Sequence, residues 1–398
     1  MDFQLSEDHL TVKKWAHEFA EQEIRPVAPQ YDETEDFPWP VVKKAAEVGL
    51  YSLDFYTEMV GQDNTGLTMP IVQEEVAWGC AGIGLGIFGT GLPLATLAYS
   101  AAPEQLAEWA PKMFGTPEDP KLGAFAVTEP GAGSDVSALR TTAKRDGDEW
   151  VLNGQKVFIT NGGIADVHVV VATVDADLGH RGQAAFILGP GTPGLRQGKK
   201  EKKLGIRASH TAEVLLDDCR VPLENVVGGV EKLESKLERA RSKQGTGRSS
   251  QALKTFEMTR PSVAAQALGI ARASLEYAID YAKDRTTWGK PIIEYQGIAF
   301  KLADMALEVD AARLLTWRAA WMARNGMDFS HAEGSMSKVK ASEVAVWVSE
   351  QAVQVLGGYG YIKDFPVEKW YRDAKIYTLF EGTSEIQRLV ISRALASA

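Results

Sequence analysis

The stretch FAVTEPGAGSD, residues 125–135, marks the point where the character of the chain changes. It ends a run of strand-forming residues and enters a loop whose Gly131 and Gly133 let the backbone come close to a ligand. Exposed N–H groups of such a loop can receive a phosphate, although a Pro-Gly turn between strands is also an ordinary turn. The loop alone leaves both interpretations open, so the flanking sequence has to be considered.

Upstream of this loop the chain has the character of helices. Ser6 can cap a first helix, on which Val12, Trp15 and Phe19 share one face. The later segment from Ala81 to Gly91 is rich in small residues. This composition predicts tight packing or the close approach of a ligand.

Downstream, between Leu122 and about Pro222, short strand-like runs alternate with turn signals such as Asp146-Gly147 and Asn153-Gly154. No helices of about 10–15 residues separate these runs, which argues against a Rossmann sheet. The pattern predicts a β domain. Its expected strands are Trp150 to Leu152, Val167 to Val174, Ala184 to Leu188 and Glu213 to Leu216.

Helical patterns return from about Lys254, and the core stripe of one long helix is marked by Leu302, Met305 and Val309. A bundle of packed helices is therefore expected in this part of the chain. Its members are predicted near 263–283, 296–325, 331–357 and 382–396.

The length of 398 residues also predicts several domains, because a single core stops growing at roughly 250–300 residues. We expect an N-terminal α-helical domain at 1–120, a central β domain at 121–230, a charged linker at 231–253 and a C-terminal bundle at 254–398.

The linker stands out because the segment from Glu231 to Ser250 mixes charges with glycine and serine. A short helix through Leu233 and Leu237 followed by a flexible turn is one interpretation, and a docking element is the other.

The charge balance narrows the classes of partner. Forty-three basic and fifty-three acidic residues leave a net charge of −10, which disfavours nucleic acid and anionic membranes. The N-terminus has no basic segment followed by an apolar run, and we expect no 18-residue apolar stretch, so the chain is predicted to be cytoplasmic. Cys80 and Cys219 lack the spacing of a metal or redox motif and are expected to be small buried residues, with no metal site.

Seven motifs in a fixed order carry a family resemblance that no single one of them would carry. They are the opening stretch at 125–135, KVFITNGG at 156–163, KLGIRAS at 203–209, TFEMTRP at 255–261, DRTTWGK at 284–290, VLGGYGY at 355–361 and FEGTSEIQR at 380–388. In this set the chain resembles the acyl-CoA dehydrogenase family, similar to its medium- and short-chain type. The resemblance extends from Phe3 to the C-terminus and departs only in the charged stretch 231–250.

The resemblance implies an α+β multidomain fold of N-terminal helices, a central β-barrel-like domain and a C-terminal four-helix bundle, assembled as a homotetramer that is a dimer of dimers. It implies FAD and an acyl-CoA bound in a cleft between the domains. It also implies an oxidoreductase of fatty-acid β-oxidation that passes electrons to an electron-transfer flavoprotein.

One set of residues matches positions that hold FAD within the same subunit. Phe158 and Thr160 match positions against the flavin ring and its N5 edge, although a core role is the alternative for Phe158. The family often has tryptophan in place of Phe158 and glutamine in place of Glu385. The remaining members of this set are Phe125, Val127, Thr128, Gly133, Ser134 and Thr383.

A second set matches positions that reach the FAD of a neighbouring subunit. A surface salt bridge is the alternative for Arg285, yet its guanidinium group suits a pyrophosphate. With Arg285, the residues Thr287, Trp288 and Gln296 belong to this set, and Gln354, Gly357 and Gly358 match positions around the adenosine portion.

On the substrate side, Glu381 matches the base that removes the α-proton of the thioester, while the β-hydrogen leaves as hydride to flavin N5. The backbone N–H of Glu381 and a ribityl hydroxyl of FAD would hold the thioester carbonyl, and desolvation would raise the pKa of the carboxyl group. Some relatives place the base where this chain has Thr259, which cannot serve. The other substrate positions are Ser134, Phe256, Glu257, Arg260 and Gly382, of which Glu257 is the rival carboxylate.

The acyl group is left open by the sequence. Gly84 suggests room at the end of the acyl cavity and Phe88 suggests a plug, so straight medium chains are the first expectation among short, branched, aromatic and steroid-side-chain thioesters. Acyl carriers other than CoA stay open too. An oxygen-using acyl-CoA oxidase and a non-catalytic flavoprotein subunit of the same fold are the alternatives to a dehydrogenase.

Overall fold

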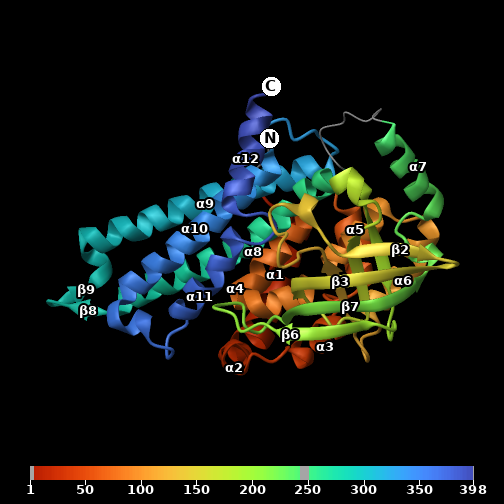
Figure 1. Cartoon of the computed structure of the whole chain (residues 1–398). Coiled ribbons are helices and arrows are strands. Elements are labelled where there is room, and N and C mark those ends of the chain that lie inside the picture. The colour runs from red at the N-terminus through yellow and green to blue at the C-terminus, as the bar shows by residue number, and fades with distance from the viewer. Residues whose placement is uncertain (1–3, 243–250, 398) are drawn as a thin grey trace.

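The protein has the expected order of helices, sheet and helices, with the sheet on one side of the molecule and the long C-terminal helices on the other (Figure 1). The structure is a computed structural model that describes residues 4–242 and 251–397, apart from the side chains of 251–258. The predicted fold class is confirmed in its three parts. The predicted domain boundaries stay a prediction.

The N-terminal part consists of helices, as predicted. Ser6 caps the first of them by accepting a hydrogen bond from the backbone N–H of His9. Three short turns of π or 3-10 helix at Ala20–Ile24, Arg25–Val27 and Phe55–Val60 connect the longer elements. The α-helices are α1 (Glu7–Phe19), α2 (Ala28–Thr34), α3 (Trp39–Glu47), α4 (Thr68–Phe88), α5 (Gly91–Ser100) and α6 (Pro103–Phe114).

Helix α4 corrects one expectation, because in the described part of the chain it is long and apolar enough to cross a membrane. Its most apolar window is 94% buried inside the protein, so it is a core helix here. The helix is kinked at Cys80, where the backbone is extended. The small residues after the kink serve tight packing: a Cβ atom on Gly89 would lie 3.1 Å from Cγ2 of Thr160.

The middle of the chain forms one curled seven-stranded sheet in the order β1-β4-β2-β3-β7-β6, with β5 paired to β4. Asp146-Gly147 makes the expected turn between β2 and β3. Asn153-Gly154 does not make a turn, because it lies inside β3 at a bulge opposite β7. The strands are β1 (Gly123–Ala126), β2 (Thr142–Asp146), β3 (Glu149–Thr160), β4 (Val167–Thr173), β5 (Gln183–Leu188), β6 (Leu195–Lys200) and β7 (Thr211–Pro222).

Strand β4 joins the sheet to the helical core. Val167 and Val169 belong to the large apolar cluster that runs through the helices, whereas Val170 and Ala172 belong to the cluster inside the β domain. Both faces of the strand are therefore buried, which explains its nearly continuous apolar sequence.

The C-terminal part is dominated by three long helices, and α8 lies against both α4 and α10. Helix α8 begins well before the predicted start at 263 and continues through Pro261. A small hairpin, β8 (Thr286–Thr287) and β9 (Lys290–Pro291), follows it at the far end of the molecule (Figure 1). The helices are α8 (Gln251–Asp284), α9 (Gln296–Arg324), α10 (Glu333–Leu356), α11 (Val367–Ala374) and α12 (Ser384–Leu395).

The charged linker contains the expected short helix, α7 (Val230–Arg241). Leu233 and Leu237 are buried in the β-domain cluster. An ion pair between Arg241 and Asp175 with a closest separation of 2.8 Å also ties this helix to the β domain. The expected flexible turn falls on residues 243–250, outside the described residues.

A buried ion cluster fastens the two helical parts to each other. Arg272 on α8 donates to Oε1 of Glu75 on α4 at 2.7 Å, and its Nε lies 3.4 Å from Glu74. Arg313 on α9 donates to the same Glu74 at 2.8 Å. Burial alone would raise the pKa of Glu74, but the two guanidinium groups hold it below its ordinary value. His17 on α1 completes the cluster with a 2.8 Å contact to Glu75.

The KLGIRAS motif at 203–209 fastens the β domain to α11. The backbone N–H of Ile206 donates to the buried carboxylate of Asp373 at 2.5 Å. Arg372 on the same helix donates to Asp32 of α2 at 2.7 Å. A Cβ atom on Gly205 would lie 2.3 Å from the carbonyl oxygen of Arg372, so only glycine allows this approach. The motif therefore positions the domains that surround the site.

We expect the substitution Arg272→Met to lower the free energy of unfolding by about 3–5 kcal/mol, because it leaves Glu74 and Glu75 buried with less compensating charge. Chemical denaturation of the purified protein measures this change.

Lys283→Met is the matched control on the same helix. Lys283 pairs with Asp280 at the surface, and its loss should cost no more than about 0.5 kcal/mol. Equal effects of the two substitutions would contradict a stabilising role of the buried cluster.

Candidate active site

Glu381 lies in the short loop that leads into α12, and its backbone is left-handed with φ 54°. Gly382 follows with φ 87°. Thr383 then caps α12 by accepting a hydrogen bond from the N–H of Ile386, as the sequence predicted. A left-handed conformation is costly for a residue with a side chain and is typical of functional positions. The backbone is therefore non-helical at Glu381, two residues before the N-cap of α12.

The carboxyl group of Glu381 lies in a half-buried environment with two cations nearby. Burial raises its pKa above the ordinary value, while the charges of Lys338 and Arg260 act in the opposite direction. Arg260, on α8, is only 5% exposed and donates to Ser335 Oγ. The structure therefore brings together Glu381 and Arg260, two residues that the sequence assigned to the substrate side.

Neither the rival carboxylate Glu257 nor its neighbour Phe256 has a described side chain. Both residues belong to the first turns of α8. Thr259 is partly buried on the same helix. The assignment of the base therefore depends on Glu381 itself.

The loop after β1 is held by a buried ion pair that the sequence did not single out. Glu129 accepts hydrogen bonds from the backbone N–H groups of Arg140 and Thr141 at 2.6 and 2.9 Å. Lys156 on β3 donates to Glu129 at 2.7 Å and to the carbonyl of Val127 at 2.9 Å. The available signal in the sequence was Lys156 in a strand-like segment, because a lysine is rarely buried unless it is paired.

The same loop leaves open space where a ligand is expected. Phe125 lies near the end of β1, and the carbonyl of Thr128 accepts from Val157 N–H at 2.8 Å. Gly133 and Ser134 are exposed. A Cβ atom on Gly133 would meet nothing within 4 Å, so packing inside this chain does not require glycine there. The absence of a side chain instead suits a ligand that approaches the backbone.

Phe158 is not a core residue. It lies on β3, where the pairing with β7 shifts between Lys156 and Ile159, and its φ is 60°. The irregular, left-handed backbone accompanies a ring that is 66% exposed. Thr160 is two residues further along the same strand and partly buried. An exposed aromatic ring beside a hydroxyl group matches the expected wall of a flat cofactor.

Thr383 and Glu385 lie at the start of α12. The Thr383 hydroxyl is engaged in capping, and the Glu385 side chain is exposed. Glu385 also lines a surface hollow together with Ser384 and Lys375. These positions lie close to Glu381 in the chain, but Glu381 does not line this hollow.

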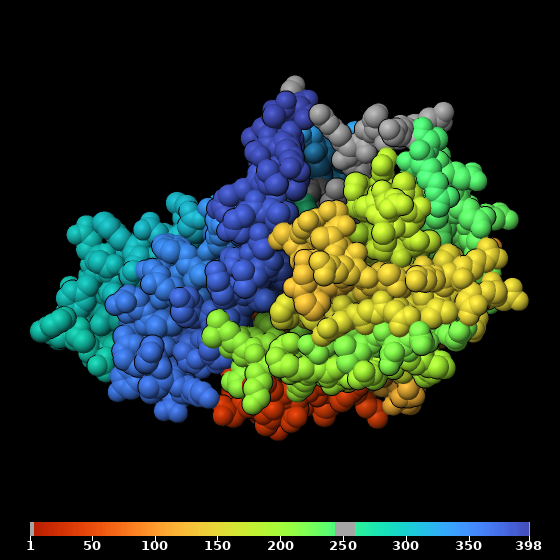
Figure 2. Space-filling model, in the orientation of Figure 1, coloured from red at the N-terminus to blue at the C-terminus, as the bar shows by residue number. Residues whose placement is uncertain are grey.

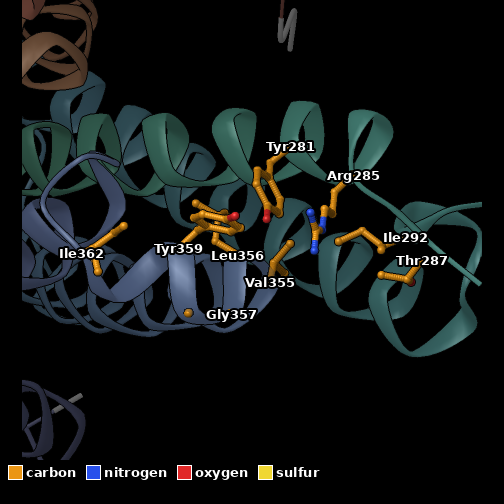
Figure 3. Close-up of a pocket in the computed structure, with 10 residues that line it drawn as sticks. Tyr281, Arg285, Thr287, Ile292, Val355, Leu356, Gly357, Tyr359 and Ile362 are labelled. Carbon is orange, nitrogen blue, oxygen red and sulfur yellow. The ribbon is translucent and has the colours of Figure 1, made fainter.

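The second predicted set gathers around a separate cavity of about 540 Å³ between the end of α8 and the end of α10 (Figure 3). Arg285 extends into it, with its guanidinium carbon 5.8 Å from the centre of the Tyr359 ring. Within the described residues Arg285 has no salt bridge, so the alternative role as a surface ion pair is not observed. Thr287, Gly357 and Gly358 line the same cavity.

Three further members of this set lie on the outside of the molecule near that cavity. Trp288 is 91% exposed, and its ring lies 5.9 Å from the ring of Tyr295. Gln296 is the first residue of α9, and Gln354 lies near the end of α10, both with exposed side chains. All three side chains are therefore exposed rather than packed inside this chain.

The substrate-side residue Arg260 and the second cofactor set are far apart within one chain. Arg260 lies on α8, and Arg285 directly follows the last residue of that helix, 25 positions further on, or about 37 Å at the rise of an α-helix. In Figure 2 the dark blue C-terminal segment lies beside the β domain, whereas the β8–β9 hairpin that follows α8 lies at the far left of Figure 1. The separation fits the expectation that the second set serves another copy of the chain.

The residues present fit a flavin nucleotide. Phe158 offers a ring face, Gly133 leaves the backbone open, and Arg285 offers a guanidinium group to a phosphate. No group of three or more histidine, cysteine, aspartate or glutamate residues that could hold a metal ion occurs in the described part of the chain.

Comparisons with known proteins agree with this geometry. Three family models match the chain: the acyl-CoA dehydrogenase N-terminal domain at residues 6–116, the middle domain at 124–219 and the C-terminal domain at 247–396. The mitochondrial short-chain specific acyl-CoA dehydrogenase of Rattus norvegicus is 43% identical over 98% of this chain and 90% of that protein.

Solved structures give the same result over the full length. Butyryl-CoA dehydrogenase from Megasphaera elsdenii has a TM-score of 0.88 at 36% identity and covers 100% of both chains. A chain in the structure described as the electron transferring flavoprotein of Acidaminococcus fermentans has a TM-score of 0.89 at 39% identity, again over 100% of both chains. The chain therefore belongs to the acyl-CoA dehydrogenase family.

Proposed function

We propose that this chain uses FAD to convert a short, straight-chain acyl-CoA into the trans-2-enoyl-CoA, with Glu381 as the base that removes the α-proton. The family consists of flavoprotein oxidoreductases that dehydrogenate acyl-CoA, and membership of the family supports this general reaction for the chain. The observation that carries the proposed mechanism is the left-handed, half-buried Glu381 beside Arg260 and Lys338.

The chemistry asks for a base of suitable strength. An α-proton of a thioester is weakly acidic, so a carboxylate that is desolvated and has a raised pKa is a better acceptor than one in water. Within the described residues, the backbone N–H of Glu381 donates no hydrogen bond, which leaves it free to donate to the thioester carbonyl. Glu381 would thus supply both the base and one donor that stabilises developing negative charge.

The remaining residues would hold the cofactor. FAD, when bound, accepts the β-hydrogen as hydride. Phe158 and Thr160 would face its ring, and the loop with Gly133 and Ser134 would approach its pyrophosphate. The cavity around Arg285 would receive the adenosine end of the FAD of a neighbouring subunit, which requires a homo-oligomer such as the predicted dimer of dimers.

A short acyl chain is favoured over the medium chain expected from the sequence. Gly84 does not provide room by itself, because a Cβ atom there would lie 3.2 Å from Cγ1 of Val76. Phe88 is buried in the same core. Relatives such as the rat enzyme are named short-chain specific, which supports the same choice.

We further propose an electron-transfer flavoprotein as the electron acceptor, in place of oxygen. The similarity to a chain in the Acidaminococcus fermentans electron transferring flavoprotein structure supports this partner. The cytoplasmic location expected from the sequence stays a prediction.

The central test is an anaerobic titration of the purified FAD-loaded protein with acyl-CoAs of increasing length. We expect bleaching of the flavin absorbance, fastest with short straight chains that have a β-carbon to give up the hydride. Fastest bleaching by medium chains would overturn the short-chain assignment, and no bleaching by any chain would overturn the proposed function. Rapid reoxidation by oxygen in the absence of an electron-transfer flavoprotein would indicate the oxidase.

Glu381→Gln should bind FAD and acyl-CoA normally but reduce the flavin at least about 100-fold more slowly, because the amide cannot accept the proton. Stopped-flow absorbance measures this rate. Glu58→Gln, at an exposed position on the Phe55–Val60 turn, is the control and should reduce at the parent rate. A normal rate in Glu381→Gln together with a slow rate in Glu257→Gln would transfer the role to Glu257.

The flavin reduction rate should fall as the pH drops through an apparent pKa above 4.5, the ordinary value for glutamate. The sign follows from burial, which raises the pKa of Glu381, so protonation inactivates the base at a higher pH than for a carboxyl group in water. Stopped-flow reduction over an acidic to neutral pH series gives the profile. A flat profile down to the ordinary carboxyl range would contradict a buried base.

A further inference from the structure

The loop at Glu381 and Gly382 is held in place by two buried polar side chains. Both residues have left-handed backbones, and such a conformation persists at a non-glycine residue only when the surroundings enforce it. Gln387 on α12 donates through Nε2 to the carbonyl oxygens of Glu381 and Gly382, each at 3.0 Å. Lys338 on α10 donates through Nζ to the carbonyl of Gly382 at 2.7 Å.

Lys338 occupies an unusual position for a lysine. It is 0% exposed in the second turn of α10, and its neighbours one turn away along the helix include the small residues Ser335, Ala341 and Ser342. In the described part of the chain, Lys338 has no carboxylate within salt-bridge distance. A buried ammonium group without a close counter-ion is costly, and such groups are typical of functional sites.

The charge of Lys338 acts on the base. Burial lowers the pKa of Lys338 to about 8, so the group is mostly protonated at neutral pH. Among the charges that favour the protonated form of Lys338, that of Glu381 has the largest effect. The charge of Lys338 in turn lowers the pKa of Glu381. The two groups therefore favour each other's charged state.

Other charged groups face this pair from three helices. Arg260 on α8 opposes the charge of Lys338 and assists it in lowering the pKa of Glu381. Glu385 on α12 and Glu343 on α10 favour the protonated lysine. Glu343 is half exposed and lies 2.7 Å from Arg388, so much of its charge is already compensated. Among the lysines of the described chain, Lys338 is the one whose charge acts on the Glu381 carboxyl group.

We propose that Lys338 and Gln387 are positioning residues for Glu381, with different tasks. Gln387 fixes the two carbonyl groups of the loop and carries no charge. Lys338 fixes the Gly382 carbonyl and also holds the base in its carboxylate form. This inference rests on the proposed role of Glu381 as the base, and it adds the groups that control the geometry and proton affinity of that base.

Three substitutions separate the tasks. Lys338→Met removes the anchor and the charge, whereas Gln387→Leu removes an anchor alone. Lys340→Met is the matched control, because Lys340 lies on the same helix two residues away and pairs with Glu308. Each FAD-loaded variant is reduced with acyl-CoA in a stopped-flow instrument over a pH series, and its FAD content and melting temperature are recorded.

The limiting rate in Lys338→Met should fall by about tenfold or more, since small misplacements of a base are costly. The acidic limb of its pH profile should move to higher pH by about one to three units, because a nearby positive charge no longer favours the carboxylate. Gln387→Leu should lower the rate without moving the limb. Lys340→Met should change neither.

A direct measurement does not depend on turnover. The carboxyl band of Glu381 can be followed by infrared titration, with Glu381→Gln as the spectrum to subtract, and Lys338→Met should raise the midpoint by the same amount. An unmoved midpoint and pH limb in folded, FAD-loaded Lys338→Met would overturn the proposal. If that variant does not fold, Lys338→Gln takes its place, with the same shift required of it.

The outcomes also separate this inference from the function on which it rests. A parent protein that no acyl-CoA reduces contradicts the proposed function. A parent protein that is reduced, with Lys338 variants that keep its pH profile, contradicts the positioning role alone.

Discussion

The packing of α8 between α4 and α10 is the contact on which the site depends. Arg272 on α8 donates to the buried carboxylate of Glu75 on α4, and the same helix carries Arg260 beside Glu381. Arg285, which directly follows α8, lines the cavity between the ends of α8 and α10. A single helix thus sets the distance between the substrate side of the site and the second predicted cofactor set, so the helical core determines the geometry of the site.

Much of the fold follows from local patterns in the sequence. Helices α9 and α10 begin and end within about two residues of the predicted limits, because their apolar periodicity is long and regular. The start of α8 was placed too late, since Pro261 would normally end a helix but here lies inside one. Asn153-Gly154 was taken for a turn because this dipeptide favours hairpins, whereas the long pairing of β3 with β7 turns it into a bulge.

The candidate site could be predicted only in part, because some of its residues stand in recognisable motifs and others do not. Glu381, Arg260 and Phe158 stand in motifs that a family shares, and motifs can be read without knowing contacts. Lys338 and Gln387 belong to helices where polar residues are normally exposed, so composition gives no reason to bury them. The small residues around Lys338 were the available signal, because they leave room for a long side chain between packed helices.

The electrostatics of Glu381 reflect two opposing needs of a base. A carboxylate that is too well stabilised would not take a proton from a carbon acid, and one that is fully desolvated without cations would already be protonated. Burial raises the pKa of Glu381 and so makes it a stronger base, while the charges of Lys338 and Arg260 limit this rise. Arg260 keeps its charge at any physiological pH, but the pKa of Lys338 is lowered to about 8. As the pH rises past that value the lysine loses its charge, and the carboxylate of Glu381 becomes more basic just where fewer protons compete for it.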